Sequence, residues 1–303
     1  METLKTETLT WHHFQNPVKA DFDFLREKFN FHDLILGELM KPTLRPKVDR
    51  YDHYLYLVLH FPIFDEKTRN TTSREIDCIV TPQELITVTY EDIPPLSDFF
   101  KKCSLDDHCK ELYSSKTPAH LLYYLIRELL HFSMRELDHI QTNITQLEEH
   151  IFGGKEREII HEILVFRRDV LNFRRTLKPQ HITINSLAEE SGELFGKNIK
   201  PFFDELKGEY LKVWDLLENH RETLEALYDT HQSLLNMHQN EIMKNLTVMA
   251  FITFPLSLIA VIFGMTTLWT PIVGMKYDFW IIVGGMAILT LIMLMFFKKK
   301  KWL

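Results

Sequence analysis

The chain has 303 residues, of which 45% are hydrophobic and 25% charged, and its formal net charge is −7. The charges are unevenly distributed, because residues 245–275 and 279–297 contain no charged side chain. Without the five lysines and the single aspartate beyond residue 244, 30 basic and 41 acidic residues remain, a formal charge of −11. This acidic balance argues against a nucleic-acid partner, whose phosphates require a basic surface.

Residues 1–115 contain both helix-like and strand-like patterns of apolar residues and predict a small cytosolic α/β domain. Residues 21–40 carry apolar side chains at helix-like spacing. The run YLYLVLHF is typical of a strand and is expected to stop at Pro62. Two further strand-like runs, IDCIV and LITVTY, are joined by the turn residues TPQE and predict a β-hairpin.

Long helices are predicted from residue 116 onward. Thr117 and Pro118 favour a helix start, because proline is tolerated in the first turn. The apolar repeat continues to about residue 152. After Gly153 and Gly154 a second helix is expected over residues 155–177, and it is expected to stop at Pro179. We therefore predict a cytosolic antiparallel helix pair within residues 116–200.

A third helix is expected to begin near Pro201 and to meet no convincing breaker before Pro255. Residues 201–244 form its stalk, and residues 245–265 form a first transmembrane span. At 1.5 Å per residue this helix is roughly 80 Å long or more. It is therefore predicted to run from the cytosolic domain into the membrane without interruption.

The two uncharged runs predict a transmembrane helical hairpin, since a bilayer core needs about 20 apolar residues in a helix. The external loop is residues 266–278, the second span is 279–297, and the basic tail is 298–303. Lysines in this tail place the C-terminus in the cytosol, and the even number of spans places the N-terminus there too. The alternative is a pair of buried core helices in a soluble protein, but such helices usually keep a polar face. The N-terminal residues METLKTETLT do not resemble a secretory signal.

The sequence contains no recognisable catalytic or zinc motif. Cys78, Cys103 and Cys109 form no CxxC pair and are interpreted as reduced cytosolic thiols. Neither the spacing around His108 nor any HxxxH arrangement fits the usual zinc motifs. No P-loop or nucleophile elbow is present, so we expect neither an enzyme nor an ATP-driven pump.

One face of the long helix is unusual for a membrane span because it carries polar groups. At 100° per residue, these side chains fall within an arc of about 100°: Asn240, Met243, Thr247, Ala250, Phe254, Ser257 and Val261. Polar groups at membrane depth face a partner helix or a water-filled cavity, and the periodicity leaves both possibilities open. Two spans cannot enclose a pore, so a pore-lining stripe requires a homo-oligomer with this helix at its axis.

The sequence Gly264-Met265-Thr266, at the outer end of the first span, resembles the Gly-Met-Asn signature of CorA-type magnesium transporters. The similarity extends to the junction NEIMKNLT, the span FPLSLIA and the tail FFKKKKW. Segments such as RPK before the first strand also lie in family-like order, so the resemblance covers nearly the whole chain.

The resemblance implies an α+β cytosolic domain, long helices and a two-helix transmembrane hairpin, assembled as a homopentameric cone whose first span lines the pore. It implies passive uptake of divalent cations, mostly Mg²⁺ and also Co²⁺ or Ni²⁺, across the plasma membrane. The expected partners are other copies of the chain, these cations and the lipid bilayer, without a cofactor beyond the transported or regulatory ion. Carried over by position, the implied pore-facing residues are Asp229, Asn240, Met243, Leu246, Phe254 and Ser257, with Gly264, Met265 and Thr266 at the outer mouth.

Family members close when Mg²⁺ binds acidic residues between neighbouring cytosolic domains. Here Glu205 matches the family position on the stalk side, and Asp204 is next to it. Asp92 or Asp98 is the candidate partner in the α/β domain. The alternative for all four is an ordinary solvated surface.

Two departures from the family pattern affect ion selectivity. Thr266 replaces the signature asparagine. In the family, a ring of asparagine amides, one from each subunit, holds hydrated Mg²⁺ through its waters. A threonine hydroxyl is shorter and has less reach. The loop 268–277 also lacks the acidic residue that the family commonly places after the signature. The alternatives are therefore a transporter of the same fold for another ion, such as Zn²⁺, or a metal sensor that does not conduct.

Overall fold

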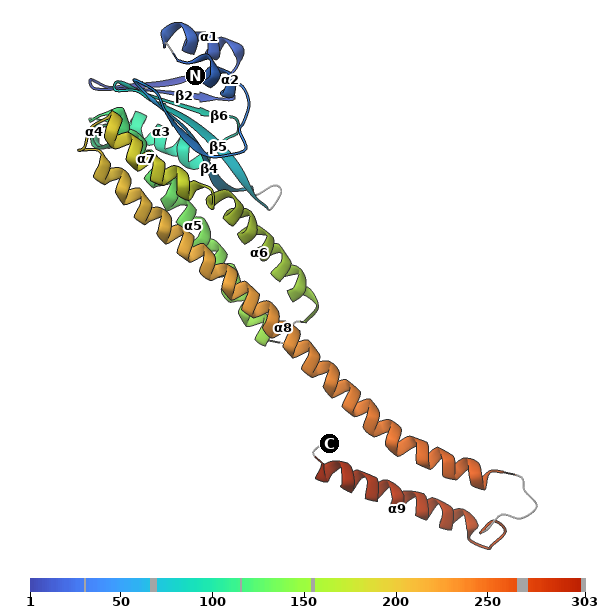
Figure 1. Cartoon of the computed structure of the whole chain (residues 1–303). Coiled ribbons are helices and arrows are strands. Elements are labelled where there is room, and N and C mark those ends of the chain that lie inside the picture. The colour runs from blue at the N-terminus through green and yellow to red at the C-terminus, as the bar shows by residue number, and fades with distance from the viewer. Residues whose placement is uncertain (30, 66–69, 115, 154–155, 266–271, 301–303) are drawn as a thin grey trace. The chain divides into compact units, whose positions relative to one another are not determined.

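The computed structural model describes residues 1–29, 31–65, 70–114, 116–153, 156–265 and 272–300 (Figure 1). The chain divides into two compact units, Met1–Tyr228 and Asp229–Leu303. Helix α8 (Lys200–Phe263) begins in the first unit and ends in the second.

The first unit is built on a sheet in the order β1-β2-β6-β5-β4-β3. Its strands are β1 (Glu2–Lys5), β2 (Thr10–Gln15), β3 (Lys47–Arg50), β4 (Leu55–Asp65), β5 (Asn70–Val80) and β6 (Glu84–Thr89). Strand β2 pairs with β6 in parallel, and the other neighbours are antiparallel. The predicted hairpin is confirmed as β5–β6, where the Thr81 N–H donates to the Glu84 carbonyl at 2.9 Å. Strands β1, β2 and β3 were not predicted.

The prediction that the fourth strand stops at Pro62 is wrong, because β4 continues to Asp65. Strand β3 pairs only with Leu55 to Val58 of β4, whereas β5 pairs with the whole of β4. Residue 62 therefore lies where the β3 side of β4 is an open edge. A proline is tolerated there, because its missing N–H removes no ladder hydrogen bond on that side.

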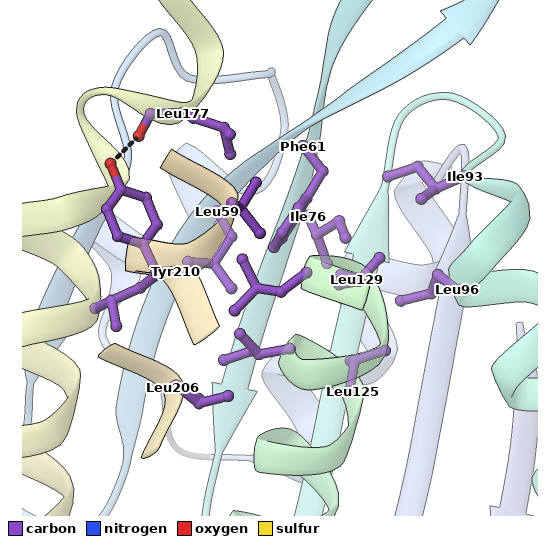
Figure 2. Packing of buried hydrophobic residues seen from close by; sticks show 14 of the residues in the cluster. Leu59, Phe61, Ile76, Ile93, Leu96, Leu125, Leu129, Leu177, Leu206 and Tyr210 are labelled. Carbon is purple, nitrogen blue, oxygen red and sulfur yellow. Dashed lines mark hydrogen bonds between the residues drawn. The ribbon is translucent and has the colours of Figure 1, made fainter. Parts of the chain in front are cut away.

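The sheet is buried on both faces, so its central strands are almost continuously apolar. In β4, Leu57 and Leu59 belong to the larger core, whereas Tyr56 and Val58 belong to a smaller core on the opposite face. Figure 2 shows the larger core, where β4 and β5 face helix α5 and helix α8. Tyr210 of α8 donates a hydrogen bond to the Leu177 carbonyl at 3.1 Å and so joins α8 to the end of α6.

The smaller core is covered by α1 (Lys19–Lys28) and α2 (Asp33–Glu38). The helix-like spacing over residues 21–40 thus belongs to two short helices. Helix α1 ends because Phe29 adopts an extended backbone, and α2 begins where His32 Nδ1 accepts from the Leu34 N–H at 3.2 Å.

The larger core is covered by helices that follow the sheet. Three of them were not predicted: α3 (Pro94–Leu105), α4 (Asp107–Ser114) and α7 (Gln180–Leu194). Helix α5 (Pro118–Phe152) begins after Thr117 as predicted, and α6 (Glu156–Leu177) agrees with the predicted second helix. Pro179 was interpreted as a helix end, but it is also the N-cap of α7.

The part of α8 in the first unit buries one stripe and exposes the rest. Its buried side chains recur every three or four residues, with His220 as the polar member of the series. The apolar members are Phe203, Leu206, Tyr210, Val213, Leu217, Leu224 and Leu227. After Leu227 this repeat ends, and Val248 is the next buried apolar residue of the helix.

The second unit contains the remainder of α8 and α9 (Asp278–Lys299). Both helices are long and apolar enough to cross a membrane. Helix α8 passes through Pro255 without a break and ends at Phe263, close to the predicted end of the first span. The rings of Phe251 and Phe297 lie 6.2 Å apart, so α8 and α9 touch near the C-terminal end of α9.

The larger core provides a stability test. Leu59 is 1% exposed and Leu44 is 97% exposed. We expect Leu59→Ala to lower the free energy of unfolding by about 2–5 kcal/mol, because it removes buried methyl groups and leaves a cavity. The matched control Leu44→Ala should change it by less than about 0.5 kcal/mol. Denaturant unfolding of the purified protein measures both, and similar values for the two variants would contradict the described core.

Candidate functional site

The described residues of the predicted pore lie on α8 or in the two positions that follow its end at Phe263, and the chain leaves them exposed. Met243 is 61% exposed, Leu246 54%, Phe254 72% and Met265 56%. Asp229, Asn240, Ser257 and Gly264 are also exposed. We call these eight residues the α8 stripe: Asp229, Asn240, Met243, Leu246, Phe254, Ser257, Gly264 and Met265.

The other residues of α8 in this segment differ in exposure. Val248 is buried at 5% exposure, and Ile252 and Ile259 are half-buried. Thr247 and Ala250, within the predicted polar arc, are also half-buried. The residues of the α8 stripe are exposed and so are available to water or to other chains.

The hydroxyl groups of α8 are satisfied within the helix. Ser257 Oγ donates to the Thr253 carbonyl at 2.9 Å, and Thr253 Oγ1 donates to the Met249 carbonyl at 2.8 Å. Each hydroxyl proton is thereby used, whereas the oxygen lone pairs remain as acceptors. Ser257 consequently needs no partner helix, and its oxygen can accept from the water shell of a cation.

Glycine avoids a tight contact directly after the end of α8. The Gly264 N–H donates to the carbonyls of Ala260 and Val261 at 3.0 and 3.1 Å. A Cβ at residue 264 would lie 3.1 Å from the Ala260 oxygen, which is closer than ordinary van der Waals contact. The predicted mouth residue Thr266 lies outside the described residues.

Asp278 is the acidic residue nearest in sequence to the predicted outer mouth, and its carboxylate is hydrogen-bonded to neighbouring backbone N–H groups. Asp278 Oδ2 accepts from the Gly274 N–H at 2.9 Å, and Oδ1 accepts from the Phe279 N–H at 2.7 Å. Gly274 has φ +99°, a backbone conformation that favours glycine. Asp278 thus stabilises the start of α9 and does not supply the carboxylate that the loop lacks.

The candidate regulatory carboxylates have separate local partners within one chain. Glu205 Oε2 accepts from the Tyr123 hydroxyl at 2.8 Å, and Asp204 pairs with Lys207 at 2.9 Å. Burial, together with this hydrogen bond, raises the pKa of Tyr123 to about 12. Sequence reasoning missed the role of Tyr123, because no local pattern signals a contact between residues so far apart in the chain.

The other two candidates lie near the start of α3. Asp92 Oδ1 accepts from Ser97 Oγ at 3.2 Å, and Asp98 is exposed. Across the parts of the chain that the structure describes, no three His, Cys, Asp or Glu side chains are placed to hold one metal ion. A site shared between neighbouring chains therefore remains a prediction for Glu205, Asp204, Asp92 and Asp98.

The cysteines lie away from the α8 stripe. Cys78, Cys103 and Cys109 are free and buried, and burial raises the pKa of Cys103 to about 12. Cys109 Sγ donates to Asp106 Oδ2 at 3.2 Å. These thiols pack in the first unit.

The fold and the α8 stripe define a two-span membrane protein with a large soluble domain and a polar face on its first span. The family model "CorA-like Mg2+ transporter protein" matches residues 6–299, and the chain belongs to this family. It is 27% identical over 299 residues to the cobalt/magnesium transport protein CorA of Thermotoga maritima, which covers 98% of this chain and 84% of that protein.

The fold of the complete chain agrees with a solved relative. The complete structure of the CorA magnesium transporter from Methanocaldococcus jannaschii matches with a TM-score of 0.85 at 21% sequence identity. The match covers 100% of this chain and 95% of that chain. The predicted α+β domain, long helices and two-helix hairpin are thereby confirmed, whereas the pentameric assembly and the roles of the individual stripe residues stay predictions.

Water access to the α8 stripe can be tested by cysteine labelling. Ser257→Cys should react at least about tenfold faster than Ile259→Cys with a charged thiol reagent, because the reactive thiolate forms in water. The two positions lie roughly 160° apart around the helix, and Ile259 is half-buried whereas Ser257 is exposed. The native cysteines are buried and provide a low background. Equal rates at both positions would contradict a water-lined stripe.

Proposed function

We propose that this chain forms a homopentameric channel that carries divalent cations, mainly Mg²⁺ and also Co²⁺ or Ni²⁺, into the cytosol. The observation that carries the proposal is the α8 stripe, which places Asn240 and Ser257 on an exposed face of a membrane-entering helix. Two spans cannot surround water, so an aqueous path requires several copies of α8 around one axis. We take the number of copies to be five, as the resemblance of the sequence to this family implies.

The driving force for uptake is electrical. Each elementary charge gains about 2.3 kcal/mol per 100 mV of inside-negative potential, so a divalent ion gains roughly twice that amount. Passive uptake into the cytosol then needs no ATP. The lysines that follow α9 support the orientation, with both termini in the cytosol at the plasma membrane.

The stripe offers the ion a sequence of neutral and acidic oxygen atoms. A ring of Asn240 amides and a ring of Ser257 hydroxyls can hold the waters of a hydrated ion. Such outer-sphere contacts suit Mg²⁺, which loses its waters reluctantly. Leu246 and Phe254 are apolar rings in the same stripe, and an apolar constriction can close a pore by expelling water.

The same assembly of chains would allow a cytosolic metal ion to close the channel. Glu205 and Asp204 lie near the start of α8, the helix that also carries the stripe, and both are exposed. A divalent ion held between these carboxylates and a neighbouring chain would tie the cytosolic domains together. Loss of this ion at low cytosolic metal would release them.

The proposal is tested by comparing two asparagines of α8. Asn240→Leu should lower Mg²⁺ flux in liposomes at least about tenfold. The substitution removes a ring of amides that binds the hydrated ion, and an increase of about 1.4 kcal/mol in the barrier to ion passage slows it tenfold. The control Asn245→Leu makes the same exchange about 140° around the helix and should leave flux unchanged.

The same preparations should be pentamers by mass measurement, with and without the substitutions. A stable monomer or dimer of the unsubstituted protein would contradict the channel. Equal flux for both variants would mean that Asn240 packs against another helix.

Selectivity is tested at Thr266, where the sequence departs from the family signature. Thr266→Asn should tighten the apparent Mg²⁺ affinity roughly fivefold, because a better hydrogen bond to the ion's water is worth about 1 kcal/mol. Cobalt hexammine, which mimics a hydrated cation, should block the variant better than the parent protein.

Paired flux titrations of both proteins in liposomes measure these two effects. Equal affinity and equal block would place the selectivity filter deeper in the α8 stripe, at Ser257 or Asn240.

A further inference from the structure

A cavity of about 280 Å³ lies in the first unit, where α5 and α6 meet the β4–β5 hairpin. Its volume is near the lower end of the roughly 300–1,000 Å³ typical of small-molecule pockets. One part of its lining is polar, with Glu136 and Asn143 from α5 and Asp169 from α6. The other part is aromatic and is formed by Phe64, Phe166 and Phe173. None of these residues belongs to the α8 stripe or to the candidate regulatory carboxylates.

Asp169 has an unsatisfied carboxylate oxygen at this cavity. The residue is only 7% exposed, and its Oδ1 atom is buried without a hydrogen-bond partner. The carboxylate accepts from the Thr71 backbone N–H, whereas the Arg168 Nε atom, at 4.0 Å from Oδ1, is beyond hydrogen-bond distance. A buried carboxylate oxygen without a donor costs free energy that a bound donor would recover.

Glu136 adds a second carboxyl group to the same lining. It is half-buried, and burial raises its pKa, although His139 and Arg135 counter this effect. Burial also raises the pKa of Asp169. Both groups would therefore gain from a positive charge placed between them.

The lining identifies the kind of cation. Among the residues that the structure describes, no three His, Cys, Asp or Glu side chains can share a metal ion, so a bare ion lacks a ligand set here. The phenylalanine walls also offer nothing to the water shell of a hydrated ion. An ammonium group can donate to both carboxylates, and an attached aliphatic chain can pack on the aromatic rings.

We propose that this cavity, formed by Asp169 and Glu136 beside three phenylalanines, binds a small organic ammonium ion such as an aliphatic diamine. The ligand would hold α5, α6 and the β4–β5 hairpin together. Its site would couple the cytosolic domain to a solute other than the transported metal.

Binding of 1,4-diaminobutane to the full-length protein in detergent tests the proposal by isothermal titration calorimetry. We expect saturable binding to one site per chain, and no binding of the neutral analogue 1,4-butanediol. Asp169→Asn should weaken diamine binding at least about tenfold, because it removes a charge-assisted hydrogen bond. The control Asp138→Asn changes an exposed aspartate of α5 outside the cavity lining and should bind as the parent does.

Glu136→Gln is a second variant that tests the site if Asp169→Asn fails to assemble, and it should also weaken binding. The proposal is overturned if the parent protein shows no saturable binding, or if a correctly assembled Asp169→Asn or Glu136→Gln variant binds the diamine equally well. Competitive displacement of the diamine by Mg²⁺ would also overturn it, because the cavity would then accept inorganic cations. Metal flux is not the readout, so failure here is distinguishable from failure of the proposed channel.

Discussion

Lipid offers no hydrogen bonds, and this constraint determines how the second unit must place its polar groups. Every polar group that α8 carries into the membrane must be satisfied by the chain itself, by water or by another copy. Ser257 and Thr253 meet this requirement by donating to carbonyls one turn earlier. Asn240 lies just before the predicted span, and its exposed amide can bind water or a neighbouring chain. The two kinds of group therefore meet the requirement differently, the hydroxyls within the helix and the amide outside it.

The first unit supplies the rigid base from which α8 starts. Its sheet is buried on both faces, and α8 contributes Phe203, Leu206 and Tyr210 to the larger core. Tyr210 also bonds to the end of α6. The beginning of α8 is therefore fixed by packing and by a buried hydrogen bond, and Glu205 lies within this fixed segment.

The sequence predicted the elements that have strong periodicity and failed where distant residues decide. The α5, α6 and α8 patterns and the two apolar runs are local signals, so their helices could be found. Pro62 was interpreted as the end of a strand, but an open strand edge tolerates it. Helix α6 does end before Pro179 as predicted, but helix α7, which begins directly after this proline, was not predicted. The parallel pairing of β2 with β6 joins residues far apart in sequence, and no local pattern encodes it. The same is true of the Tyr123–Glu205 contact and the cavity at Asp169.

The charges between the two spans affect the rate at which ions are captured. Lys276 and Asp278 are the charged residues of the segment between the two spans, and their formal charges cancel. The two backbone N–H groups that bind Asp278 favour its charged form and hold it in place, so at long range its charge is offset by that of Lys276 and the pair gives little net field for an approaching cation. Electrostatic steering accelerates association and is weakened by salt. Capture of ions from the outside should therefore proceed at an unaccelerated diffusional rate that changes little with ionic strength.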